Sequence, residues 1–113
     1  LKMTFEDLQR LTLEWAEDKD LLHAQNAEKQ FMKFIEEVFE FKMECDISYY
    51  QGRVRKDLEH NLRLEMGDIF VTLIILCEDL GIDPVVCLEM AYEKISKRKG
   101  KTINGTFVKS EDL

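Results

Sequence analysis

The sequence predicts an all-α fold, a four-helix bundle-like domain spanning residues 1–113 that assembles as a homo-oligomer. The chain of 113 residues is 45% hydrophobic and 35% charged, with one proline and five glycines, a composition that suits a compact helical domain with one modest core. Apolar residues recur at steps of three and four over long stretches, which is the period of a helix with a buried face. Because four helices leave much apolar surface on so short a chain, we expect paired subunits to cover part of it.

Capping and breaking residues predict the first two helices. Thr4 is followed three residues later by Asp7, a capping-box pattern that starts a helix over about residues 4–19. A second helix is expected over residues 27–50, where apolar side chains follow the helical period. Gly52 is its expected stop.

The third and fourth helices are bounded in the same way. The third is expected from about residue 54 to residue 80, with Gly81 as its stop, and an Asp-Pro dipeptide then opens a fourth helix that lasts to about Lys99. Gly100 is expected to close that helix. The basic C-terminal tail, residues 100–113, contains an Asn-Gly turn signal and is expected to fold back as a short hairpin or loop.

The cysteines and the apolar runs bear on location. Cys45, Cys77 and Cys87 are widely spaced and form no CxxC pair, which favours buried thiols in a reducing cytoplasm. The longest apolar run, residues 69–77, is much shorter than the roughly 20 residues needed to cross a bilayer. The first residues show no signal-peptide pattern. We therefore expect a cytoplasmic protein with no membrane partner.

Charge is distributed unevenly along the chain, whose net charge is −7. Residues 94–109 carry six basic residues and no acidic one, whereas residues 1–93 carry 10 basic and 21 acidic residues. An acidic body argues against binding a nucleic acid polymer, which requires a broad basic face. The local basic segment remains compatible with a small phosphorylated ligand.

Acidic residues of the second predicted helix form one narrow strip. At 100° per residue, Glu36, Glu37 and Glu40 fall on the same side of the helix, next to Gln30 and Lys33. Such a strip is typical of the solvated face of an amphipathic helix, and on its own it favours that interpretation.

The third predicted helix changes this balance. Glu65 and Asp68 are three residues apart and share a face, and the run that follows, residues 69–77, is apolar all round, as expected of a buried helix. Carboxylates beside a core need a counter-charge, and a cation would supply it. Carboxylate oxygens suit Mg²⁺ or Mn²⁺; iron is the second choice, but His23 and His60 do not follow these acids at the spacing of a di-iron bundle.

These motifs resemble a known family. "EEVFE" at residues 36–40 followed by "EMGD" at residues 65–68 is similar to the ExxE and ExxD pattern of the MazG-like nucleotide pyrophosphohydrolases, of the all-α NTP pyrophosphatase superfamily. The likeness covers about residues 12–113, and the ending resembles the short members from phages and Gram-positive bacteria. Phe39 departs from the pattern, because many members have glycine there.

The resemblance implies Mg²⁺-dependent hydrolysis of nucleoside triphosphates to a monophosphate and pyrophosphate, in the cytoplasm of a bacterial or phage-infected cell, by a homodimer or a dimer of dimers. It implies Glu37, Glu40, Glu65 and Asp68 as the metal ligands, with Mn²⁺ as a possible substitute. It also implies that Glu36, beside Glu37, orients or deprotonates the attacking water.

Further residues are candidates for substrate binding. Basic residues near the end of the fourth helix have two interpretations. They either stabilise the C-terminus of the helix through its dipole, or they bind phosphate groups of a ligand as a clamp, and the resemblance favours the clamp. Trp15 is expected in the core, with enclosure of a base as the alternative. The substrate-binding candidates are Gln30, Lys33, Lys94, Arg98, Lys101 and Trp15. A non-catalytic helical module that binds a nucleotide or a protein stays open as the alternative function.

Overall fold

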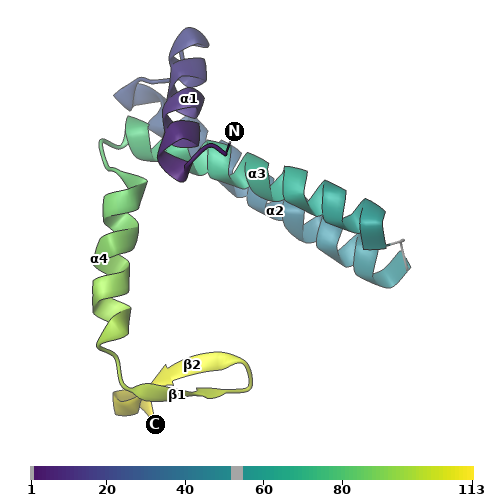
Figure 1. The fold of residues 1–113 in the computed structure, drawn as a ribbon, viewed down its shortest axis with the longest axis vertical. Helices are drawn as coiled ribbons and strands as arrows, with labels where there is room; N and C mark the ends of the chain where they lie inside the picture. The colour runs from purple at the N-terminus through teal and green to yellow at the C-terminus, as the bar shows by residue number, and fades with distance from the viewer. Residues whose placement is uncertain (1, 52–54) are drawn as a thin grey trace. The chain divides into compact units, whose positions relative to one another are not determined.

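The computed structural model describes the backbone of residues 2–51 and 55–113 and the side chains of residues 2–47 and 58–113. The chain divides into two compact units, residues 1–82 and residues 83–113 (Figure 1). Helices dominate the first unit, and a helix followed by a small hairpin makes up the second. The prediction of a mostly helical chain is therefore confirmed, whereas the packing of four helices in one bundle stays a prediction.

Helix α1 (Phe5–Asp18) begins as the capping pattern predicts. The backbone N–H of Asp7 donates to the Thr4 hydroxyl at 3.0 Å, and the backbone N–H of Thr4 donates to the Asp7 carboxylate at 3.0 Å. This reciprocal pair satisfies two N–H groups that the first turn would otherwise leave free. The same carboxylate contacts hold the pKa of Asp7 below its ordinary value.

A short 3-10 turn, Ala24–Asn26, leads into α2 (Ala27–Gln51), which is followed by α3 (Arg55–Asp79). The two long helices lie side by side and form most of the contacts of the first unit (Figure 1), and α1 packs on α3. Gly52, the expected stop of the second helix, lies outside the described residues. Gly81 does follow the end of α3 and has a φ of +73°, a conformation that glycine adopts without the penalty of a Cβ.

The core of the first unit is small and centres on the second half of α3. One residue of α1, Ala16, and the run Ile74–Cys77 are buried. The expected all-round burial of residues 69–77 is wrong at Phe70, which is exposed and makes an edge-to-face contact with Phe5 of α1 at 6.3 Å between ring centroids. The fully buried apolar part of the run is thus its C-terminal end, Ile74–Cys77.

In the second unit, α4 (Pro84–Ser96) is followed by the antiparallel strands β1 (Gly100–Ile103) and β2 (Thr106–Lys109) and by a short 3-10 turn, Ser110–Asp112. The Asp83 carboxylate caps α4 by accepting from the backbone N–H of Val85 at 2.9 Å. Asn104 and Gly105 have φ values of +50° and +82°, as a two-residue hairpin turn requires. Of the two forms expected for the tail, a short hairpin or a loop, the structure has the hairpin.

Gly100 has a different role from the one predicted. The fourth helix ends at Ser96, and Gly100 is the first residue of β1 instead of the helix stop. A Cβ on Gly100 would lie 2.1 Å from the carbonyl oxygen of Val108, so only glycine allows the two strands to approach there.

The prediction that all three cysteines are buried is correct only for Cys77; Cys45 is half-buried and Cys87 is exposed on α4. Within the described residues, none of the helices is both long and apolar enough to span a bilayer.

Candidate metal centre

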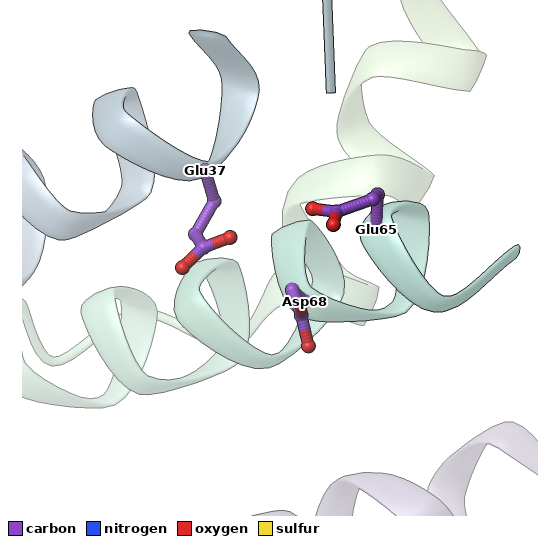
Figure 2. A group of neighbouring side chains, drawn as sticks. All are labelled: Glu37, Glu65 and Asp68. Carbon is purple, nitrogen blue, oxygen red and sulfur yellow. The ribbon is translucent and has the colours of Figure 1, made fainter. Parts of the chain in front are cut away.

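Three of the four carboxylates predicted as metal ligands come together between α2 and α3. Glu37 extends from α2 toward α3, and Glu65 and Asp68 stand on neighbouring turns of α3 (Figure 2). One oxygen from each carboxylate lies within 4.8 Å of the other two. Residues three apart share a helix face, so the spacing in "EMGD" presents both α3 acids to the same space.

Burial sets this cluster apart from an ordinary acidic surface. Glu37 is only 8% exposed, Glu65 is half-buried and Asp68 is exposed. One oxygen of Glu37 and one of Glu65 are buried and have no hydrogen-bond partner among the described residues. Leaving a buried carboxylate oxygen without a partner is costly, and a divalent cation between the helices would remove that cost. The residues present therefore fit Mg²⁺ or Mn²⁺.

The interpretation of the acidic strip as a solvated face holds for part of it. Glu36 and Glu40 are exposed, as that interpretation predicts, but Glu37 is buried against α3. The Glu40 carboxylate is not among the three that converge, and its assignment as a ligand stays a prediction. The negative charge of Glu37 raises the pKa of Glu40, because ionising both places two negative charges one turn apart.

Lys33 connects the two neighbouring acids of α2. Its Nζ lies 3.4 Å from the Glu37 carboxylate and 3.6 Å from the Glu36 carboxylate. The contact with Glu37, more than that with Glu36, raises the pKa of Lys33. The charge of Lys33 is therefore engaged in orienting the two acids.

A cavity of about 440 Å³ opens beside the acidic cluster, between α1, α2 and α3. Trp15, expected in the core, is 50% exposed and forms part of the wall, whereas the next residue of α1, Ala16, is the one that is buried. The α2 side of the wall is polar, and the α3 side combines polar with aliphatic side chains. Its residues are Trp15, Leu21, Lys29, Gln30, Lys33, Glu37, Asp68, Val71, Thr72 and Ile75.

The candidate phosphate clamp belongs to the second unit. Lys94 lies in the last turn of α4, and Lys101 is exposed on β1. Arg98 lines a separate hollow of about 290 Å³ together with Lys99, Lys109, Ser110 and Glu111. The hairpin thus brings Lys109, a residue outside the predicted clamp, close to Arg98.

Sequence reasoning missed Lys29 as a residue of the cavity wall. Its position four residues before Lys33, on the same helical strip, was the signal that could have indicated it. Phe39, which departs from the pattern of the family that the motifs resemble, is 64% exposed. Comparison of the chain with protein-family models, with curated proteins and with solved structures found no match.

Proposed function

We propose that the protein is a Mg²⁺-dependent nucleoside triphosphate pyrophosphohydrolase of the MazG-like type, which cleaves between the α and β phosphates and releases a monophosphate and pyrophosphate. The observation that carries this proposal is the convergence of Glu37, Glu65 and Asp68 with buried, unpartnered oxygens on the first two. A carboxylate site of this kind, with an open cavity beside it, suits a cation that also contacts substrate phosphates.

In this proposal, Glu37, Glu65 and Asp68 hold the cation, and Glu40 completes the set. When bound, Mg²⁺ or Mn²⁺ supplies charge neutralisation for phosphate oxygens and acidifies a coordinated water. Glu36 is exposed beside the centre and is the candidate to accept a proton from the attacking water. Lys33 orients Glu36 and Glu37 through its two ion pairs.

The cavity supports the substrate part of the proposal. Trp15 offers an indole face for a base, and Gln30 offers an amide that can donate and accept hydrogen bonds. In the second unit, Lys94, Arg98 and Lys101 are the candidates for contacts with phosphate oxygens.

Purified protein incubated with each common NTP and dNTP and with Mg²⁺ tests the activity. We expect the parent protein to release pyrophosphate. The Glu37→Gln and Asp68→Asn variants should release it at least 100-fold more slowly, because each removes a negative charge from the cation site. Glu28→Gln, at an exposed position in the first turn of α2, is the matched control and should hydrolyse substrate normally. Absence of pyrophosphate with every nucleotide would show that the proposal is wrong.

The same preparation distinguishes the alternatives. A protein that binds nucleotides with Mg²⁺ but never releases pyrophosphate is the non-catalytic module. A di-iron protein would be coloured or redox-active; among the described residues, the carboxylate cluster includes no histidine, which gives iron less support than Mg²⁺. We further propose a homodimer or a dimer of dimers that works in the cytoplasm.

A further inference from the structure

Lys29 lies on the cavity wall but belongs to neither acidic motif. It is in the first turn of α2, four residues before Lys33, so the two ammonium groups occupy one strip of the helix. The strip therefore has a basic end, at Lys29 and Lys33, and an acidic end that begins at Glu36. The cavity borders the basic end and reaches Glu37 at its other side.

The charges of the two lysines are used differently. Lys33 is engaged by Glu36 and Glu37, whereas no described carboxylate lies within ion-pairing distance of Lys29. Like charges at four-residue spacing repel, and a cation in the first turn also opposes the helix dipole. Lys29 is thus placed where its charge does not stabilise the helix, on the wall of a cavity open to a ligand.

We propose that Lys29 binds a phosphate group of the ligand that occupies this cavity. Glu37 lies eight positions after Lys29, a rise of about 12 Å along the helix axis, so an elongated polyphosphate can contact Lys29 while its other end reaches the acidic cluster. Identification of that ligand as a nucleoside triphosphate rests on the proposed function; the assignment of Lys29 to a phosphate does not.

Binding is measured with Mg²⁺ and inorganic tripolyphosphate, which has no base or sugar. Trp15 is the single tryptophan of the chain and lines the same cavity, so its fluorescence reports occupancy without any need for turnover. We expect Lys29→Gln to raise the Kd about 5- to 10-fold, since a charge-assisted hydrogen bond to phosphate is lost. Lys29→Arg should stay within about 3-fold of the parent protein, because the charge is retained.

Lys42→Gln is the control for loss of one positive charge from α2. Lys42 pairs with Asp46 and does not line the cavity, so its replacement should leave the Kd within about 2-fold. The assignment would be overturned if the Lys29→Gln variant bound tripolyphosphate as tightly as the parent protein. It would also be overturned if the parent protein did not bind tripolyphosphate at millimolar concentration. Weaker nucleotide binding with unchanged tripolyphosphate binding would also overturn it, by assigning Lys29 to the base or sugar. If tripolyphosphate binds through Lys29 but no nucleotide is hydrolysed, the proposed function fails and the Lys29 assignment stands.

Discussion

At the scale of single residues, the least expected feature of the candidate metal centre is the burial of Glu37 between two exposed acids of the same helix, Glu36 and Glu40. Glu36 and Glu40 remain solvated, so their charges cost little, whereas Glu37 and Glu65 each bury an oxygen without a hydrogen bond. Proteins rarely leave such groups unsatisfied. A cation that compensates both oxygens should therefore stabilise the fold as well as serve chemistry.

Metal addition is expected to raise the melting temperature. If Mg²⁺ is present at ten times its Kd, binding to the folded state adds about 1.4 kcal/mol, or roughly 5 °C or more for a domain of this size. The comparison is a thermal melt in 5 mM MgCl₂ against one in EDTA. Glu37→Gln should abolish the rise and Glu28→Gln should keep it, since only Glu37 belongs to the cluster. An equal rise in both variants would place the ion elsewhere.

Asp79, in the last turn of α3, is a second buried acid that the site does not use. It is 7% exposed, and neither oxygen meets hydrogen-bond geometry with any described residue. Burial raises its pKa above the ordinary value of 3.8, and the nearby backbone N–H of His23 offsets only part of that rise. The carboxyl of Asp79 therefore holds its proton more tightly in the folded state than in the unfolded state. This difference adds to the free energy of unfolding at low pH, and the contribution is lost as the pH rises from about 4 through the folded-state pKa.

Asp79→Asn should accordingly be more stable than the parent at pH 7, by a few degrees in melting temperature, because it removes a charge that burial penalises. The gain should shrink as the pH is lowered toward 4, where the parent carboxyl is protonated too. Glu78→Gln removes a charge from the neighbouring exposed position and should show no such pH-dependent gain. A gain that persists unchanged at pH 4 would contradict the burial argument.

The sequence predicted that Glu37, Glu65 and Asp68 share one site, and the structure brings these three together. The spacing was reliable on α3, but on α2 the acid three residues after Glu37, Glu40, does not converge with them. The sequence was insufficient for Trp15, which periodicity assigned to the core, and for Lys29. The exposure of Trp15 and the place of Lys29 on the cavity wall both depend on how the helices pack. The helical period of apolar residues predicts which face of a helix is buried, but not which other helix covers that face.

At the scale of elements, local chemistry predicted boundaries well. Thr4 caps α1, Gly81 follows α3, and Asn104 with Gly105 forms the hairpin turn. Each of these depends on a few neighbouring residues. The end of α4 was predicted three residues late, because Gly100 was interpreted as a helix stop. Its lack of a side chain instead allows β1 to approach the Val108 carbonyl of β2.

Gly67→Ala tests the element that carries the acids. Gly67 lies within α3, between Glu65 and Asp68, and a Cβ there would meet nothing within 4 Å. Replacing a helical glycine in open space should stabilise the protein by about 0.5–1 kcal/mol in urea unfolding. Mg²⁺ should still raise the melting temperature. Destabilisation instead would mean that a surface absent from the single chain packs on this glycine.

Gly100→Ala should have the opposite effect. The new Cβ would lie 2.1 Å from the Val108 carbonyl oxygen and 2.7 Å from Phe107 Cζ, so the strands must separate at this end. The backbone N–H of Ser110, which donates to the Lys99 carbonyl at 2.8 Å, should then exchange at least 10-fold faster with deuterium. Unchanged exchange would contradict the expected separation of the two strands at this end.

At the scale of the whole molecule, the chain exposes more large apolar side chains than it buries in its core. Both units do so: Phe31 and Met32 of α2 are exposed in the first, and Leu88 and Met90 of α4 in the second. Apolar surface of this extent usually marks an interface, and a second copy of the chain is the partner that a symmetric oligomer supplies.

Light scattering at about 100 μM should therefore give a mass of at least twice the 13.4 kDa of one chain, and the melting temperature should rise with concentration. Leu88, 71% exposed in the middle of α4, is the point to disrupt: Leu88→Glu places a charge on the apolar face and should lower the mass. Gln25→Glu adds the same charge at an exposed polar position and should leave the mass unchanged.

A mass of one chain for the parent protein would refute the oligomer. If the Leu88→Glu variant were still oligomeric, only the participation of α4 would be refuted. Because the acidic cluster is complete within α2 and α3, dissociation should leave its Mg²⁺-dependent stabilisation in place.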